Sequence, residues 1–499
     1  MKKMMMTLAA ILCCAMMSSV FIACSDNDES PIPPNPSQEM AEYTIIFYGH
    51  GGGNLDAPIM ENIQDFFNAD ESSYKKVNIA VQYKFSCEDG MKATGYIDDD
   101  AAENWSLKTI RFVGDNSLAG KGLSWLDDDM AYGEDNCDIT NPDSLTNFIN
   151  WAAKVCPAKH YVLIISDHGG SYMPHEDLPY EPGTRAVVYD DGHNEDVFSV
   201  SSLTAAIRNA SIRPQVIYMD ACLMNNVEYQ FELKDLCDYY VASTFTVPAD
   251  GGDYTTLVNL LAQETDIEKV LAGIVDSAIE KWDDDRIFID ITATRMDKLD
   301  DFGVAMKAFT DKLVEAYQSG DQAVVDAIDD CTEFAFKIDE DKPSYDLIDY
   351  VNALCNELPD VFSADLRSQV INAYEASVVK AACSQTLAEN DLSVELSVLM
   401  GYDNTYIYTA IALDSDGEEV DVIVYFYSDG RRVTLKVNDP DFIRDKTWES
   451  TFDATYKQLK FDKVVGWSRW IELNHQMPCQ DSPVEWDSGF FQDVMDYIR

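Results

Sequence analysis

The stretches YVLIISDHGG (residues 161–170) and VIYMDACLM (residues 216–224) each begin with an unbroken apolar run and end in polar or reactive side chains. Short apolar runs rich in Val and Ile are typical of strands buried on both faces of a parallel sheet. In such a sheet, reactive groups lie just beyond the carboxyl ends of the strands. The sequence therefore predicts that His168 and Cys222 follow two strand ends at one edge of a sheet.

Further strands and helices alternate around these two runs. The expected strands are 43–47, 77–81, 109–113, 186–189 and 239–243, and the expected helices are 58–67, 143–155, 200–209 and 224–236. Strands separated by helices form βαβ units, which build a mostly parallel sheet with helices on both faces. We therefore expect an α/β domain over residues 42–295.

The C-terminal part follows a different pattern. Residues 255–382 have mainly helical periodicity, with one strand expected at 287–291. Strand-like runs dominate residues 392–437, where Ser428-Asp-Gly-Arg431 is typical of a hairpin connection. Residues 296–499 are therefore expected to form a helical and β-rich C-terminal region.

The chain is long and strongly acidic. Its 499 residues include 36 Lys and Arg against 89 Asp and Glu, which gives a formal net charge of −53. A surface this acidic repels phosphate, so we expect no nucleic-acid partner. The length exceeds that of one ordinary core and predicts more than one packed unit.

The N-terminus is expected to be a lipoprotein signal peptide. A basic head at residues 2–3 precedes an apolar run over residues 4–20, as in secretory signals. The next four residues, Phe21-Ile-Ala-Cys24, resemble the lipobox of bacterial lipoproteins. That resemblance implies removal of residues 1–23 and acylation of Cys24, with palmitate among the acyl groups. An ordinary signal peptide cut nearby is the alternative.

Residues 24–41 are expected to form an acidic, proline-rich tether at the outer membrane or cell surface. The stretch Ser25-Asp-Asn-Asp-Glu29 resembles an export signal that sends some lipoproteins to the surface, and a solvated linker is the alternative. No later run reaches the ~20 apolar residues of a membrane span. Lipid, rather than a helix, is therefore expected to anchor the mature protein.

His168 and Cys222 form the candidate catalytic pair. An imidazole beside a thiol takes or stabilises the thiol proton, and the thiolate is the nucleophile. A helix expected from residue 224 would favour the thiolate through its dipole. Gly169 lets backbone approach the substrate, and its N–H and that of Cys222 are the candidate oxyanion donors. The alternatives without a catalytic role are a buried thiol at a strand end for Cys222 and a capped loop histidine for His168.

The motifs around this pair resemble the clostripain family of cysteine peptidases. They are Asp167-His-Gly-Gly-Ser-Tyr172, the block from Tyr218 to Tyr229 with its Asp-Ala-Cys-Leu-Met core, and the block from Val241 to Tyr254; softer matches lie at 345–350 and 461–470. The resemblance implies a caspase-like α/β fold with a His168/Cys222 dyad. It also implies a thiol protease that cleaves protein or peptide substrates after Arg or Lys.

A preference for basic residues requires a carboxylate in the pocket, because a buried guanidinium is costly unless it is paired. Asp220, two residues before Cys222, matches the family position on the pocket wall; capping of nearby backbone N–H groups is the alternative. Asp250 is expected to be the second carboxylate. An Asx-turn before Gly251-Gly252 is its alternative.

The chain departs from the family pattern in the segment from Tyr48 to Asp56. The family usually carries an Ala-Asp-Asn-type loop there, whereas this chain has His50 followed by three glycines. His50 is therefore a second candidate for the catalytic imidazole, although a glycine-rich rim is the expected role of the segment. After Gly170, Ser and Tyr stand where family members often have Trp.

The family is often activated by cleavage between the His and the Cys. Arg185 is the candidate self-cleavage site, because Arg208 lies in an expected helix and Arg213 precedes a proline. A strand-start arginine paired with a nearby acid is the alternative. The acidic loop at residues 190–196 has oxygen ligands suited to Ca²⁺, but an ordinary solvated loop is preferred. We therefore expect no metal site and no cofactor, with calcium left open.

Other enzyme classes lack the motifs that they require. A serine hydrolase needs Gly-x-Ser-x-Gly and a zinc peptidase needs His-Glu-x-x-His, and neither occurs. The nine cysteines beyond Cys24 include no Cys-x-x-Cys pair, so neither a zinc ribbon nor a disulfide scaffold is indicated. The remaining alternative is a catalytically silent surface lipoprotein that binds a host protein or glycan.

Overall fold

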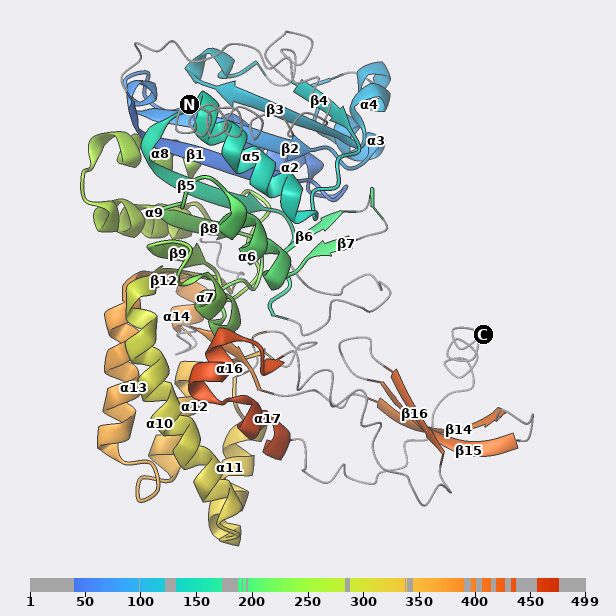
Figure 1. Ribbon diagram of the computed structural model, residues 1–499, viewed down its shortest axis with the longest axis vertical. Coiled ribbons are helices and arrows are strands. Elements are labelled where there is room, and N and C mark those ends of the chain that lie inside the picture. Colours follow the sequence, from blue (N-terminus) through green and yellow to red (C-terminus); the bar gives the residue numbers. More distant parts are fainter. Residues whose placement is uncertain are drawn as a thin grey trace, which may run out of the picture. The chain divides into compact units, whose positions relative to one another are not determined.

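A mixed sheet crosses the α/β domain (Figure 1). A computed structural model describes residues 40–97, 99–121, 132–172, 187–190, 192–193, 196–282, 288–336, 338, 344–389, 396–400, 406–413, 419–426, 432–436 and 456–474. Within these residues, nine strands pair in the order β12-β10-β9-β8-β5-β1-β2-β3-β4. The strands are β1 (Ala41–His50), β2 (Val77–Lys84), β3 (Lys108–Gly114), β4 (Tyr132–Asp135), β5 (Ala158–Ser166), β8 (Val216–Asp220), β9 (Tyr239–Ala242), β10 (Asp290–Arg295) and β12 (Val378–Cys383).

The five central strands, from β9 to β2, run parallel to one another, and the strands at both edges are antiparallel. The expectation of a mostly parallel sheet flanked by helices is therefore confirmed. The sequence pattern did not predict that the edge strands would be antiparallel. The strand expected at 287–291 begins later, at Asp290, and the structure does not describe Ile287.

Alternate residues of β1 face two separate hydrophobic cores. Ile45 and Phe47 pack into one core, and Ile46 and Tyr48 pack into the other. The first core is covered by α2 (Asp56–Asp65), α8 (Tyr254–Gln263) and α9 (Ile267–Trp282); the second is covered by α5 (Pro142–Val155), α6 (Val200–Asn209) and α7 (Val227–Leu233). Both faces of the strands are thus buried, which explains why their sequences are continuously apolar.

Three of the expected helix starts were wrong. Helix α2 begins at Asp56, two residues before the expected start. Helix α5 begins at Pro142 rather than residue 143, because Asn141 caps it by accepting from the N–H of Asp143. The helix expected from residue 224 begins at Val227, because Asn226 caps it through the N–H of Tyr229. The start of α6 at Val200 agrees with the prediction, with Ser199 as its cap.

The remaining described elements lie in the connections and in the C-terminal region. They are α3 (Glu88–Ala93), α4 (Asp99–Trp105), β6 (Val187–Asp190), β7 (Asp196–Phe198), α10 (Leu299–Gln318), α11 (Gln322–Glu333), β11 (Ser344–Asp346), α12 (Leu347–Glu357), α13 (Ala364–Ser377), α14 (Gln385–Glu389), β13 (Ser397–Leu399), β14 (Tyr406–Leu413), β15 (Glu419–Phe426), β16 (Arg432–Lys436), α16 (Lys460–Val465) and α17 (Ser468–Asn474), with short 3-10 helices at Ser73–Lys75, Asn116–Leu118 and Met296–Lys298. Strands β14, β15 and β16 form a small antiparallel sheet. Ser428–Arg431, the expected hairpin turn, lies outside the described residues.

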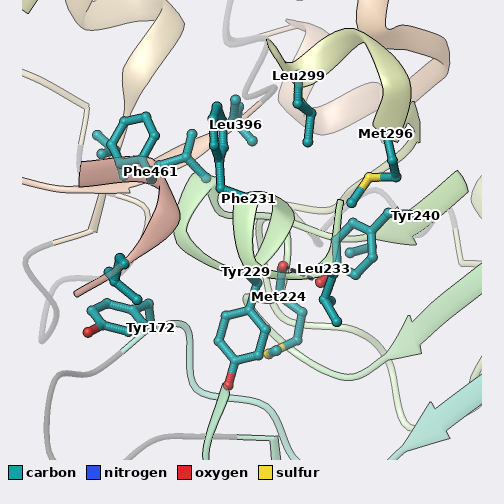
Figure 2. Packing of buried hydrophobic residues seen from close by; sticks show 14 of the residues in the cluster. Tyr172, Met224, Tyr229, Phe231, Leu233, Tyr240, Met296, Leu299, Leu396 and Phe461 are labelled. Atoms are coloured by element: carbon teal, nitrogen blue, oxygen red, sulfur yellow. Dashed lines mark hydrogen bonds between the residues drawn. The ribbon is translucent and has the colours of Figure 1, made fainter. Parts of the chain in front are cut away.

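The C-terminal region packs directly against α7. Strand β12, which lies beyond the expected boundary at residue 295, pairs with β10 and extends the main sheet. Phe231 of α7 packs against Phe461 of α16, with ring centroids 5.1 Å apart (Figure 2). Among the described residues, no helix has the length and apolar character that crossing a membrane requires.

A buried carboxyl group joins α7 to this C-terminal region. Glu228 accepts hydrogen bonds at Oε1 from the N–H of Leu399, at 3.0 Å, and from the hydroxyl of Tyr456, at 2.9 Å. Burial raises the pKa of Glu228 to about 7, although the N–H of Leu399 and other donors act in the opposite direction. The folded protein therefore holds a proton on Glu228 at pH values at which the unfolded chain has released it.

We predict that Glu228→Gln changes the pH dependence of stability. Because the pKa is raised on folding, the contribution of Glu228 is largest below its ordinary pKa and is lost as the pH rises toward about 7. Glutamine imitates the protonated acid and does not titrate. The free energy of unfolding of the variant, relative to wild type, should therefore rise between about pH 4.5 and 7, by at most about 3 kcal/mol.

Urea unfolding followed at pH 5, 6, 7 and 8 measures this difference. Glu357→Gln, at an exposed position of α12, is the matched control and should show a constant difference from wild type. A constant difference for Glu228→Gln as well would contradict the prediction.

Candidate active site

The two candidate catalytic loops leave the sheet from the carboxyl ends of β5 and β8. These strands are parallel neighbours, and Ser166 pairs with Asp220 at their ends. His168 and Cys222 each lie two residues beyond this pair, so both follow the end of a strand by the same number of residues. Strand order and register therefore place the two loops at the same edge of the sheet.

Gly169 contacts the backbone of Cys222. A Cβ atom at position 169 would collide with the carbonyl oxygen of Cys222 and would lie 2.7 Å from its nitrogen. Only glycine allows the two loops to approach this closely. The structure therefore brings together the histidine loop and the cysteine loop, with the two expected oxyanion donors in adjoining backbone segments.

Cys222 is half-buried and lies on a turn. The N–H of Val247 donates to its Sγ at 3.3 Å, an arrangement that stabilises negative charge on sulfur. This donor was not predicted. The helix that was expected to favour the thiolate begins only at Val227, four residues beyond Leu223, and the N–H of Val247 contacts the sulfur directly.

The turn after Cys222 is held in a strained conformation. Leu223 has a positive φ of 63°, which is uncommon for a residue other than glycine. Its N–H donates to the carbonyl of Phe245 at 2.9 Å, and its side chain is buried in a cluster with Phe245, Ile338 and Leu387. Neighbouring structure thus over-determines the backbone that carries Cys222.

Asp290 fixes the segment that contacts the turn at Cys222 and Leu223. Its buried carboxylate accepts hydrogen bonds from the N–H and hydroxyl of Thr244, the N–H of Phe245 and the hydroxyl of Ser243. Burial raises the pKa of Asp290 to about 6, and these four donors limit the rise. Sequence analysis missed Asp290, because nothing in its local pattern distinguishes it from other acids near a strand.

His168 is half-buried, and its ring lies beside the glycine-rich segment. Its Nε2 is 2.9 Å from Oδ1 of Asn54. Its backbone N–H donates to Oδ1 of Asp167 at 2.5 Å. Asn54 was also missed by sequence analysis, although it stands in the segment where the family's asparagine-containing loop was expected.

His50, the second candidate imidazole, lies in the interior. Its Nδ1 is 3.2 Å from Oδ2 of Asp167, and both side chains are fully buried. Asp167 therefore connects the two histidines: one oxygen pairs with His50 and the other accepts from the backbone of His168. In this arrangement His50 supports the loop that presents His168.

Asp220 lies beneath the loop that contains Asp250. Asp220 is 5% exposed, and it accepts hydrogen bonds from the hydroxyls of Tyr254 and Ser166. Burial raises its pKa, against the lowering effect of Tyr254. A Cβ at Gly251 would lie 2.8 Å from Oδ2 of Asp220, so the loop rests directly on this carboxylate. Asp250 itself is exposed, and Lys281 donates to its carbonyl oxygen at 2.7 Å.

The remaining predicted site residues are not part of this group of side chains. Cys24, Arg185 and part of the acidic loop 190–196 fall outside the described residues. Asp190 pairs with Lys84 at 2.5 Å, and both side chains are fully buried. Among the described residues, no cluster of His, Cys, Asp and Glu could hold a metal ion, and no disulfide joins any two of the eight described cysteines.

Comparisons with known proteins point to one family. A sequence model of the clostripain family matches residues 114–472. A secreted C11 cysteine protease from Bacteroides thetaiotaomicron, solved with an irreversible peptide inhibitor, is similar over 86% of this chain and 99% of that chain, with 15% identity and a TM-score of 0.52. An inactive zymogen C11 protease from Parabacteroides distasonis matches over the same shares, with 15% identity and a TM-score of 0.49.

A search of curated proteins found no match. The family match spans well over half of the chain, and it contains both strand ends with His168 and Cys222. The solved protease from B. thetaiotaomicron supports the same fold. The chain therefore belongs to the clostripain family of cysteine peptidases.

Proposed function

We propose that the protein is a cysteine endopeptidase that cleaves after Arg or Lys with a His168/Cys222 dyad. The observation that carries the proposal is the backbone contact between Gly169 and Cys222, which joins the two loops at one edge of the sheet. Membership of the clostripain family supports the same chemistry.

The proposed reaction begins with transfer of the Cys222 thiol proton to the imidazole of His168. The sulfur attacks the carbonyl carbon of the scissile bond, and the N–H groups of Gly169 and Cys222 stabilise the oxyanion that forms. His168 then returns the proton to the departing amine, which leaves a thioester on Cys222. Water, deprotonated by His168, hydrolyses the thioester and restores the thiol.

The N–H of Val247 contributes to the first step of this reaction. It lies 3.3 Å from Sγ and donates toward it before substrate binds. A fixed donor at this position favours the ion pair of thiolate and imidazolium over the neutral pair. The strained turn at Leu223 keeps the sulfur against this donor.

Two carboxylates are proposed to recognise the basic side chain before the cut. Asp250 is exposed, in the loop that rests on Asp220, and would contact the cation directly. Asp220 would supply charge from below, since its Oδ1 has no hydrogen-bond partner among the described residues. A cation bound above this pair would favour the ionised form of Asp220, whose pKa burial raises.

The site of action is proposed to be the cell surface or outer membrane. The lipobox-like sequence at Cys24 supports anchoring by lipid, and the B. thetaiotaomicron protease described as secreted supports export. Self-cleavage after Arg185 is proposed as the activating step. A protein or peptide containing Arg or Lys is the proposed substrate.

We predict that Cys222→Ala and His168→Ala each abolish cleavage of fluorogenic Arg and Lys peptides. The first variant lacks the nucleophile, and the second lacks the proton acceptor, so rates should fall by at least ~100-fold. Peptides with Asp before the cut should remain uncleaved by the wild type. Activity that survives in Cys222→Ala would reject the mechanism, and a preference for Asp would reject the pocket.

A second prediction concerns Gly169. Gly169→Ala should remove activity, because the added methyl group collides with the Cys222 carbonyl and must push the two loops apart. The rate of iodoacetamide labelling of Cys222 and the thermal midpoint, measured together, separate local displacement from unfolding. Gly273→Ala in α9 is the control, because its methyl group would meet the end of the Leu260 side chain rather than backbone, and it should keep wild-type activity. Wild-type turnover in Gly169→Ala would contradict the proposed contact.

A third prediction concerns specificity. Asp250→Asn should lower kcat/KM for Arg and Lys peptides by roughly 10- to 100-fold, the usual worth of a charge-assisted hydrogen bond. Labelling of Cys222 by iodoacetamide should not change, because the dyad is intact. Asp360→Asn, in an exposed turn of the C-terminal region, is the matched control. Unchanged kcat/KM in Asp250→Asn would remove this residue from the pocket.

A further inference from the structure

Three consecutive glycines shape the turn from Gly51 to Asn54. A Cβ at Gly51 would collide with Oδ1 of Asp56 and would lie 2.7 Å from its Cα. Gly52 and Gly53 have positive φ values of 51° and 75°, which side chains rarely tolerate. Each glycine is thus required by the geometry of the turn.

The turn is fixed at both of its ends. The N–H of Gly51 donates to the carbonyl of Lys84 at 3.2 Å, and the N–H of Leu55 donates to the carbonyl of Gly51 at 2.8 Å. The hydroxyl of Ser86 accepts from the N–H of Gly53 and donates to the buried carboxylate of Asp56. The residue at the tip of this turn therefore has a defined position.

Asn54 occupies that tip and contacts the catalytic histidine. Its Oδ1 is 2.9 Å from Nε2 of His168. The backbone approaches the same ring, since a Cβ at Gly52 would lie 3.4 Å from Cδ2 of His168. Asn54 itself is exposed, so its position comes from the turn and from the imidazole rather than from packing in a core.

We propose that Asn54 is the positioning residue of the catalytic histidine. This inference rests on the proposed dyad and names a third member of that site. An amide oxygen can only accept, so it holds the proton on Nε2, and the exchange with the Cys222 thiol falls to the opposite ring nitrogen, Nδ1. The same oxygen stabilises the imidazolium that forms when the thiol is deprotonated.

The arrangement predicts a direction for the pH dependence. Among the described residues, the titratable groups near the His168 loop include Asp167 on that loop, His50 behind Asp167 and Cys222 on the adjoining loop. Substitution at Asn54 leaves all three in place. Loss of the acceptor should therefore destabilise the imidazolium alone, and an added negative charge should stabilise it.

The experiment compares Asn54→Ala and Asn54→Asp with wild type on an Arg peptide, across pH 5 to 9. Asn54→Ala should lower kcat by about 10-fold or more with KM nearly unchanged, and the descending limb of the kcat profile should move to lower pH. Asn54→Asp keeps an acceptor, so it should recover part of kcat and move that limb to higher pH.

Asn104→Ala is the matched control, because Asn104 is an exposed asparagine whose amide donates to the carbonyl of Asp100 within α4. It should retain the wild-type profile. Wild-type kcat in Asn54→Ala, or a loss of thermal stability without movement of the descending limb, would overturn the inference. If His168→Ala retains activity, the dyad itself fails; if only the Asn54 variants behave as wild type, the dyad stands without this third member.

Discussion

The register between β5 and β8 is the constraint on which the site depends. Ser166 and Asp220 pair at the ends of these strands, and just beyond them Gly169 of one loop contacts the backbone of Cys222 in the other. Both strands are buried on their two faces, so a slip of one residue would turn apolar side chains into the wrong core. Packing of the sheet thus fixes how closely two loops approach that lie far apart in the sequence.

Buried carboxylates hold the loops that surround this edge. Asp56 accepts from Ser86 and Cys87, Asp167 from the backbone of His168, and Asp290 from the segment at 243–245. Each carboxylate receives backbone N–H groups that would otherwise be buried without partners. The rigidity of the loops therefore comes from side chains that lie behind them, away from the surface where substrate would bind.

The positions of the strands, and the candidates at their ends, were visible in the sequence because apolar runs followed by His-Gly or Asp-Ala-Cys are local patterns. The start of α7 was misplaced because Asn226, a polar cap, competes with the apolar periodicity that begins at Met224. Asn54 and Asp290 could not be found in this way. Their contacts join residues 114 and 46 positions apart, and only the folded chain brings them together.

The hydrogen bonds from Glu228 to Leu399 and Tyr456 span 171 and 228 residues of chain. Ser397, two residues before Leu399, also donates to the carbonyl of Asn225, three residues beyond Cys222. A nascent chain that has emerged only as far as β10 lacks all of these partners. The helix that follows Cys222 therefore gains its final contacts late in synthesis, when nearly the whole polypeptide has left the ribosome.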